Sequence, residues 1–145
     1  MTRHTEIKVV PFSAEDMFDL VADIERYPDF LPWCQGAKVY EQKGSRLKAD
    51  LSVGFSTLSE VFTSLVTLER PNCISVDYGG GSLRYLKNQW RFRDRGPGRC
   101  EIEFFVDFKL KSPLLAIMMD VFFERAFLKM VRAFEDRAHE QYGMK

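Results

Sequence analysis

The sequence predicts an α+β fold in which a curved antiparallel sheet wraps around a long C-terminal helix. Three observations lead to this fold class. Apolar residues recur with a period of two from Ala37 to Leu110, which is typical of strands with one buried face. Short connections containing Gly or Pro separate these strands, and such connections favour antiparallel hairpins. The segment after Ser112 has helical periodicity and is the only one long enough to cover the sheet.

The composition is that of a folded domain without an overall charge. The 145 residues are 46% hydrophobic and include 13 Phe, so we expect one domain spanning residues 1–145. Lys and Arg together number 21, as do Asp and Glu. The net charge therefore gives no reason to expect a nucleic-acid partner, and DNA binding is not expected.

The cysteines and the N-terminus indicate a cytoplasmic protein. Cys34, Cys73 and Cys100 are odd in number and form no C-x-x-C pair, which favours free thiols in a reducing compartment. The first residues lack the apolar block of a signal peptide, and no apolar run is long enough to cross a bilayer. We expect a cytoplasmic location, with peripheral contact on the inner face of the cell membrane as a further expectation.

One strand and two short helices precede the strands of the meander. The segment from Thr5 to Val10 alternates as a strand does, with Ile7 and Val9 on one face. Ser13 begins a helix in FSAEDMFDLV, because its hydroxyl can accept a backbone N–H of the first turn. A second short helix is expected around residues 23–31.

Six strands follow, and four of them place a recognisable apolar set on one face. Gly44-Ser45, Arg70-Pro71-Asn72 and Gly96-Pro97-Gly98 have turn chemistry, and Gly79-Gly80-Gly81 is expected to be a flexible break. The sets on the apolar faces are Leu47, Ala49, Leu51 and Val53; Phe62, Val66 and Leu68; Leu86, Trp90 and Phe92; and Ile102, Phe104, Val106, Phe108 and Leu110.

The last segment carries helix signals at both ends. Ser112 is a good N-cap, Pro113 occupies the first helical position, and Gly143 is a natural terminator. A helix from Pro113 to Tyr142 would be about 45 Å long.

Two features suggest a partly open space between the sheet and this helix. The first half of the helix is apolar nearly all round and contains the pairs Met118-Met119 and Phe122-Phe123. The stretch RYPDFLPWC holds Phe30 and Trp33 between prolines, which makes a stiff apolar lip. Apolar side chains kept at a cavity wall forgo stability from burial, so both features indicate a site for a hydrophobic ligand.

Several stretches resemble the coenzyme Q-binding protein family, within the START-like (polyketide cyclase and lipid-transport) helix-grip superfamily. They are FSAEDMFDLVADIERYPDFLPWC, ADLSVGFSTLSEVFTSLVTLERP, LRYLKNQWRF and VDFKLKSPLLAIMMDVFFERAFLKMVRAFEDRA. The resemblance covers nearly the whole chain. Its most specific element is Tyr27-Pro28-x-Phe30-Leu31-Pro32-Trp33-Cys34.

The resemblance implies a hydrophobic tunnel that binds ubiquinone or a similar polyprenyl quinone. It also implies a carrier or chaperone that supports ubiquinone biosynthesis and respiratory electron transport, with ubiquinone (coenzyme Q) as bound ligand and no catalytic cofactor. Carried over by position, the ligand-binding residues fall into three groups. The mouth has Phe30, Leu31, Pro32 and Trp33, and the sheet side has Leu51, Phe62, Trp90 and Phe104. The helix side has Met119, Phe122, Phe123 and Met130.

The chain departs from the family pattern at one loop. Family members often read Gly-Pro-Phe before the strand that bears the Trp, whereas this chain reads Gly81-Ser82-Leu83. We expect a looser loop here and the loss of one aromatic contact with the tunnel wall.

A ribosome-associated regulator is the main alternative. The resemblance extends to a bacterial branch that includes a toxin acting on the association of ribosomal subunits. Arg84, Arg91, Arg93, Arg95 and Arg99 form a local basic cluster that could meet rRNA phosphates. The competing interpretation is a solvent face neutralised by Glu101 and Glu103 on the next strand, and the zero net charge favours it.

An enzyme is the third possibility, because polyketide cyclases share the helix-grip fold. Catalysis would need titratable groups that point into the cavity, and the candidates are Asp50, Glu60 and Asp77. Alternation places Asp50 on the outer face and leaves the other two ambiguous. The two histidines, His4 and His139, lie near opposite termini, so neither a metal cluster nor a catalytic set is expected.

Overall fold

The computed structural model describes residues 2–31, 33–55 and 58–143. Its elements follow in the order expected from the sequence, with one strand, short helices, six further strands and one long helix. They are β1 (Thr2–Val10), α1 (Ala14–Ala22), the 3-10 helix η1 (Ile24–Arg26), α2 (Tyr27–Phe30), β2 (Cys34–Lys43), β3 (Arg46–Phe55), β4 (Leu58–Glu69), β5 (Cys73–Gly81), β6 (Leu83–Asp94), β7 (Cys100–Leu110) and α3 (Pro113–Tyr142).

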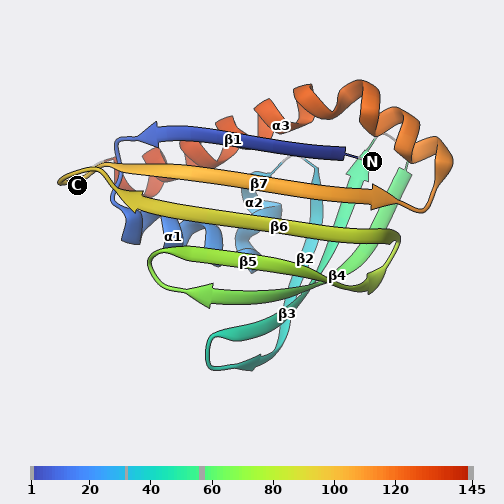
Figure 1. Cartoon of the computed structure of the whole chain (residues 1–145), viewed down its shortest axis with the longest axis horizontal. Helices are drawn as coiled ribbons and strands as arrows, with labels where there is room; N and C mark the ends of the chain where they lie inside the picture. Colours follow the sequence, from blue (N-terminus) through green and yellow to red (C-terminus); the bar gives the residue numbers. More distant parts are fainter. Residues whose placement is uncertain (1, 32, 56–57, 144–145) are drawn as a thin grey trace.

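The seven strands form one antiparallel sheet in the order β1-β7-β6-β5-β4-β3-β2 (Figure 1). Consecutive strands from β2 to β7 are neighbours, as expected for a meander joined by short turns. The first strand pairs with the last, in a register that runs from Thr2 opposite Phe108 to Val10 opposite Cys100. The predicted fold class is confirmed.

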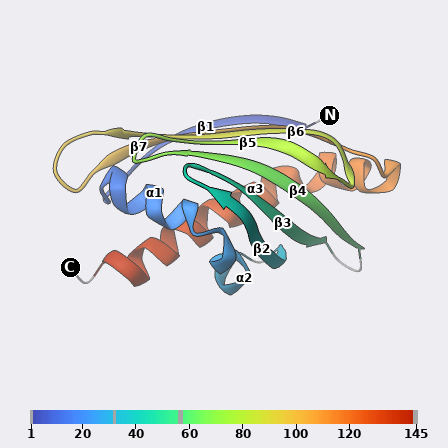
Figure 2. The ribbon, with the colours of Figure 1, turned by 90° about the horizontal axis from the view of Figure 1, so that it is seen from below.

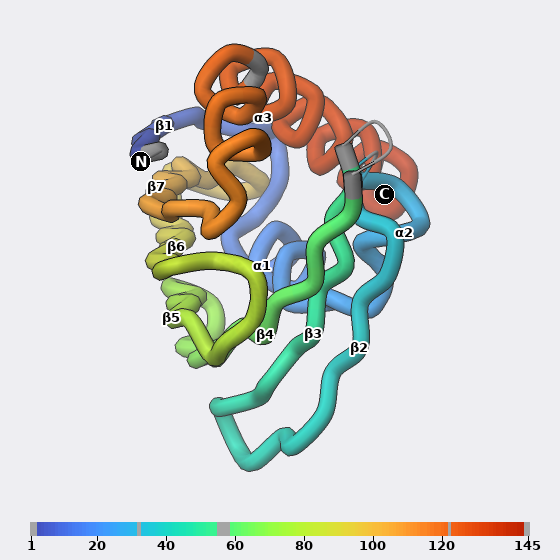
Figure 3. Tube along the Cα trace, turned by 90° about the vertical axis from the view of Figure 1, so that its right-hand side faces the viewer, coloured from blue at the N-terminus to red at the C-terminus, as the bar shows by residue number. Residues whose placement is uncertain are grey.

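The helices all lie on one side of the sheet (Figure 2). Seen from the end, β5–β7 and β2–β4 form two arms of a curved sheet, and α3 runs across the open side between them (Figure 3). This arrangement follows from the sequence, because the strands have one apolar face and α3 is the element long enough to cover it.

The N-caps of the two main helices are made by the predicted serines. The hydroxyl of Ser13 accepts the backbone N–H of Asp16 at 3.1 Å, and that of Ser112 accepts the N–H of Leu115 at 3.3 Å. Each serine thereby satisfies one of the N–H groups that the first helical turn leaves without a partner. The two caps fix where α1 and α3 begin relative to the sheet.

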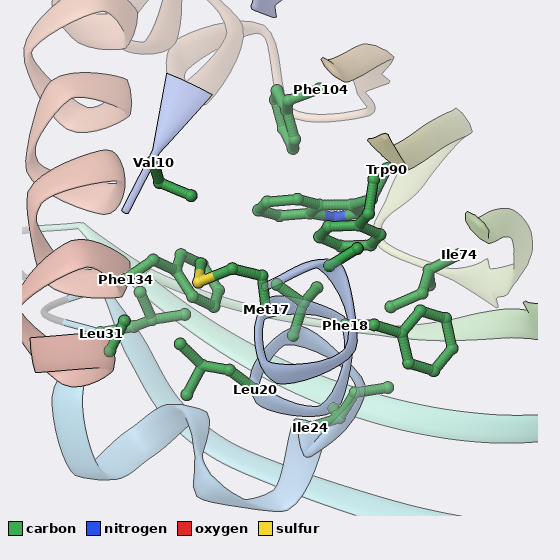
Figure 4. Packing of buried hydrophobic residues seen from close by; sticks show 14 of the residues in the cluster. Val10, Met17, Phe18, Leu20, Ile24, Leu31, Ile74, Trp90, Phe104 and Phe134 are labelled. Atoms are coloured by element: carbon green, nitrogen blue, oxygen red, sulfur yellow. The ribbon is translucent and has the colours of Figure 1, made fainter. Parts of the chain in front are cut away.

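A cluster of buried apolar side chains lies where α1 meets β6 and the second half of α3 (Figure 4). Met17 and Phe18 of α1 are each 2% exposed, and the ring of Phe18 lies 5.8 Å from that of Phe92. Trp90 contacts Phe134 of α3 with ring centroids 5.3 Å apart. This cluster holds α1 and the second half of α3 against β6.

The apolar face of β1 points away from the helices. Ile7 and Val9 share a face, as alternation predicts, but their side chains are 58% and 44% exposed. The opposite face meets α3 through polar residues. Lys8 forms an ion pair with Glu135, and the ring of His4 lies 4.2 Å from that of Phe127.

The expectation of a flexible break at Gly79-Gly80-Gly81 is wrong, because β5 continues through Gly81. Gly81 pairs with Phe62 of β4 and has a φ of 127°, a conformation open to glycine. A Cβ at this position would lie 2.6 Å from the carbonyl oxygen of Val61. The glycine thus allows two strands to approach closely where the register shifts, rather than ending the strand.

Candidate functional site

A cavity of about 280 Å³ lies between the inner face of the sheet and the helices α1 and α3. Side chains from the five strands β3 to β7 and from the helices line it, and nearly all of them are apolar. Ligand pockets in proteins are typically about 300–1,000 Å³ and mostly apolar with a few polar groups. This cavity has that chemistry, and its volume is slightly below that size range.

The four residues expected on the sheet side all line the cavity. They lie on four different strands: Leu51 on β3, Phe62 on β4, Trp90 on β6 and Phe104 on β7. The rings of Trp90 and Phe104 meet edge to face with centroids 4.7 Å apart, which stiffens this wall. Strand alternation explains their common direction, since each belongs to the apolar set of its strand.

On the helix side, the structure places three of the four expected residues at the cavity. Met119, Phe123 and Met130 line it from α3. They recur at spacings of four and seven residues, so they occupy one face of the helix. The side chain of Phe122 lies outside the described residues.

At the lip, two expected residues line the cavity and one does not. Leu31 and Trp33 contribute to the lining. Phe30 instead packs against the outside of the lip, where its ring lies 6.1 Å from that of Tyr27 and 5.2 Å from that of Phe134. Pro32 lies outside the described residues. Phe30 therefore holds the lip against α3, and its side chain does not line the cavity.

The few polar groups in the lining come from positions that the apolar pattern does not single out. They are Tyr27, Glu60, Ser64 and Asn88. Ser64 and Asn88 share the parity of the apolar residues two places before and after them, so strand alternation could have found them. Among the candidate catalytic carboxylates, Glu60 faces the cavity, whereas Asp77 is exposed.

The third candidate carboxylate, Asp50, lies on the outer face of β3, as alternation predicts. Its carboxylate accepts hydrogen bonds from the hydroxyls of Tyr40 at 3.0 Å and Thr63 at 2.7 Å. These bonds explain its presence on the strand without any catalytic role.

Tyr27 lines the cavity with its ring but uses its hydroxyl elsewhere. The hydroxyl donates to the carbonyl oxygen of Val21, near the end of α1. Burial, followed by the nearby Cys34 and Asp23, raises the pKa of Tyr27 well above its ordinary value. Tyr27 is therefore a neutral donor with an occupied hydrogen bond, which suits it to hold the lip and not to exchange protons with a ligand.

The loop at Gly81-Ser82-Leu83, where the departure from the family pattern lies, is held by hydrogen bonds. The hydroxyl and the backbone N–H of Ser82 both donate to the carbonyl oxygen of Val61 at 3.2 Å. The N–H of Leu83 donates to the hydroxyl of Tyr78 at 3.0 Å, and the Leu83 side chain is 4% exposed and lines the cavity. A leucine thus completes the wall, and the loop is tied to two strands.

Two of the five arginines in the basic cluster, Arg93 and Arg95, are paired with acidic residues. Arg93 contacts Glu101 at 3.3 Å and Glu103 at 2.9 Å across the β6–β7 pair, and Arg95 contacts Glu101 at 2.9 Å. The neighbouring Arg95 and Arg93 lower the pKa of Glu101, so this carboxylate stays ionised. The neutralised solvent face is the interpretation that the geometry bears out for these residues.

The first half of α3 carries an exposed apolar stripe opposite its cavity-lining face. Its members are Leu114, Ile117, Val121 and Leu128, whose side chains are 59–69% exposed. In the described ranges, none of the helices is both long and apolar enough to cross a membrane.

A family model described as polyketide cyclase / dehydrase and lipid transport matches residues 10–135 of the chain. Relatives with two different names are similar at nearly the same level. Ribosome association toxin RatA of Pseudomonas aeruginosa is 35% identical over 93% of this chain and 94% of its own length. Coenzyme Q-binding protein COQ10 homolog B of Xenopus laevis is 36% identical over 97% of this chain, which spans 59% of that relative's length.

Solved structures agree on the architecture. The 18 kDa protein CC1736 of Caulobacter crescentus is 34% identical, covers 99% of both chains and has a TM-score of 0.80. The Zhui aromatase/cyclase of Streptomyces sp. R1128 is 16% identical and covers 97% of this chain and 94% of its own, with a TM-score of 0.83. At that identity, the second likeness concerns the fold alone.

Proposed function

The chain belongs to the polyketide cyclase / dehydrase and lipid-transport family, and from this premise we propose that it binds ubiquinone or a similar polyprenyl quinone. The observation that carries the proposal is the apolar cavity between the sheet and α3, with Leu31 and Trp33 at its lip. The name of the Xenopus relative, which states coenzyme Q binding, supports the ligand class. In this role the chain is a carrier or chaperone that supports ubiquinone biosynthesis and respiratory electron transport.

The lining supports binding rather than catalysis. Among the described residues its titratable side chains are Tyr27 and Glu60, and the hydroxyl of Tyr27 already donates a hydrogen bond to a backbone carbonyl. General acid–base chemistry uses positioned groups that exchange protons with the reacting atoms. A single glutamate at a wall of apolar side chains lacks the second group that most such reactions use, so we propose a protein that holds its ligand unchanged.

The size of the cavity bears on how the ligand is held. At about 280 Å³ it accommodates a quinone ring and a short part of a polyprenyl tail. The remainder of a long tail must lie outside the cavity, where it needs apolar surroundings. The exposed stripe of Leu114, Ile117 and Val121 lies on the helix that lines the cavity, so we propose that it contacts the inner face of the cell membrane while the ligand enters or leaves.

The direct test is lipid extraction and mass spectrometry of protein purified from quinone-producing cells. We expect ubiquinone to copurify with the wild-type chain. We further expect a deletion strain to respire poorly on quinone-dependent substrates and to recover when a short-tailed quinone analogue is supplied. The absence of quinone after purification, together with no binding of added quinone, would contradict the proposal.

Ribosome association is the second candidate function, and the similarity to relatives named ribosome association toxin RatA favours it. The cluster of arginines adds little support, because Arg93 and Arg95 are already paired with Glu101 and Glu103. Sucrose-gradient profiles separate the two functions. A ribosome-binding regulator shifts the ratio of free subunits to assembled ribosomes when purified protein is added, whereas a quinone carrier leaves the profile unchanged.

A further inference from the structure

Ser64 is a buried polar residue in the middle of the apolar wall. It lies on β4 with its side chain on the cavity side, and it is 3% exposed. Its hydroxyl makes no hydrogen bond with any residue in the described ranges. Among the described residues, Arg137 Nε is the fully enclosed side-chain polar atom without a partner, so the Ser64 oxygen is instead accessible from the cavity. A ligand in the cavity can therefore supply the hydrogen-bond partner that the protein itself does not provide.

Asn88 of β6 brings a second polar group to the same cavity. Its amide nitrogen donates to the carbonyl oxygen of Phe105 at 2.7 Å, which fixes the orientation of the carboxamide. A carboxamide has a second N–H and an oxygen, and in Asn88 these are not used by that bond. Strand β5 lies between Ser64 on β4 and Asn88 on β6. Its residue Val76 pairs with Asn88 on one side and with Val66 on the other. Ser64 lies two residues from Val66, so both polar groups emerge from the centre of the inner face.

We propose that Ser64 and Asn88 form a polar subsite in the cavity interior that binds the uncharged, oxygen-bearing head group of the ligand. This inference rests on the proposed function and adds the orientation to it: the head group lies inside, and the apolar chain points toward the rim. Both residues offer an N–H or O–H donor, and a quinone carbonyl is an acceptor, so the hydrogen-bonding types match.

The charge of the lining restricts the ligand further. Glu60 is the one charged side chain among the described residues of the lining, and no cation accompanies it there. A carboxylate ligand with its head inside would be desolvated without a counter-charge. Glu60 pairs with Val53, and the next residue, Gly54, donates its N–H to the carbonyl oxygen of Trp33 at the lip, so a carboxylate head group at the rim would lie near Glu60. The cavity therefore selects neutral amphiphiles over fatty acids in either orientation.

The test compares two probes that differ in their carbonyl groups: a decyl-substituted dimethoxybenzoquinone and decylbenzene. Affinities are measured by displacement of a fluorescent apolar dye from wild type, Ser64→Ala and Ser52→Ala. Ser52 is the matched control, because it lies on β3 and is not among the cavity-lining residues. We expect Ser64→Ala to bind the quinone about threefold to tenfold more weakly, the effect of one net hydrogen bond, and to bind decylbenzene as wild type does.

Folding of the variant is checked by thermal unfolding without ligand. We expect Ser64→Ala to unfold at the same temperature as wild type or higher, because the substitution breaks no hydrogen bond within the described residues and leaves an apolar side chain in an apolar wall. Infrared spectroscopy gives a second readout: the quinone carbonyl stretch should lie at lower frequency in wild type than in Ser64→Ala.

Equal quinone affinities for wild type and Ser64→Ala would overturn the subsite and indicate a trapped water as the partner of Ser64. In that case quinone binding by wild type would leave the proposed function intact. If wild type bound neither probe, both proposals would be wrong.

The charge argument is tested with dodecanoate, a fatty-acid anion. Dodecanoate should bind Glu60→Gln several-fold more tightly than wild type. Equally tight dodecanoate binding by the two proteins would contradict the argument.

Discussion

The guanidinium group of Arg137 lies over the ring of Phe30, with 5.4 Å between the guanidinium carbon and the ring centroid. Arg137 belongs to α3 and Phe30 to α2, so this contact joins the lip of the cavity to the long helix. Phe30 also meets Phe134 one turn earlier on α3. The relationship explains why an aromatic residue of the lip faces away from the cavity.

Replacing Arg137 by Ala should loosen the lip. Cation–π contacts contribute about 0.5–2 kcal/mol, and the Arg side chain also covers apolar surface, so we expect the free energy of unfolding to fall by about 1–2 kcal/mol. Urea denaturation measures this change, and quinone release should become faster in the variant. Arg132→Ala is the control, because Arg132 is exposed on the same helix. Equal stability of the two variants would contradict a role for Arg137 at the lip.

Filling the cavity should separate binding from folding. Val76 lines the cavity from β5, whereas Val61 of β4 is 52% exposed on the outer face. We expect Val76→Phe to lower quinone affinity by about tenfold or more, because the larger ring occupies the space of the ligand. Val61→Phe is the same substitution outside the cavity and should bind as wild type does. Thermal unfolding without ligand establishes that both variants fold.

The pH dependence of stability should reveal the burial of Cys100. This residue is 0% exposed, and burial, followed by the nearby Asp94 and Glu15, raises the pKa of its thiol to about 11. The unfolded thiol ionises near its ordinary pKa of about 8.5, so in the interval up to about 11 the unfolded state loses a proton that the native state keeps. Stability therefore decreases as the pH rises through this interval, by up to about 3 kcal/mol.

The measurement is urea denaturation between pH 8 and pH 11 for wild type and Cys100→Ala. The variant should show a shallower decrease, with the remaining slope due to other groups such as Tyr27. Below pH 8 the two proteins should differ by a constant amount only. Parallel curves across the whole range would show that Cys100 does not titrate differently in the folded and unfolded states.

Residue periodicity predicted the fold and the sheet side of the cavity well. The period of two assigns Leu51 and Phe62 to one face without knowledge of the partner strand. It does not say which face is covered, and so Ile7 and Val9 of β1 proved to be exposed. The same period of two also assigns Ser64 to the inner face, although Ser64 does not stand out when apolar residues alone are considered.

Features that depend on contacts between distant segments could not be predicted from the sequence. The outward direction of Phe30 depends on Arg137 and Phe134, which lie more than a hundred residues later in the chain. Gly81 looks like a breaker of local structure, yet its role depends on the approach of the backbone of β4. Local propensity describes what a residue tolerates, and tertiary contacts decide how that tolerance is used.

Membrane contact should depend on the exposed stripe of α3. Ile117 and Val121 are 63% and 69% exposed, and neither lines the cavity. We expect the double variant Ile117→Asp/Val121→Asp to float less with liposomes than wild type, because two carboxylates at the interface oppose insertion of the apolar face. Since acidic as well as basic residues flank the stripe, recovery of wild type should depend little on the content of anionic lipid.

The matched control exchanges the same residue types at another exposed site. Ile7 and Val9 on β1 are 58% and 44% exposed, so Ile7→Asp/Val9→Asp introduces equal charge without touching α3. This control should float as wild type does. Equal losses in the two double variants would show that added charge alone reduces flotation, and no flotation of wild type would exclude the stripe as a membrane contact. Quinone binding in detergent should be unchanged in both variants, because the substituted residues lie outside the cavity lining.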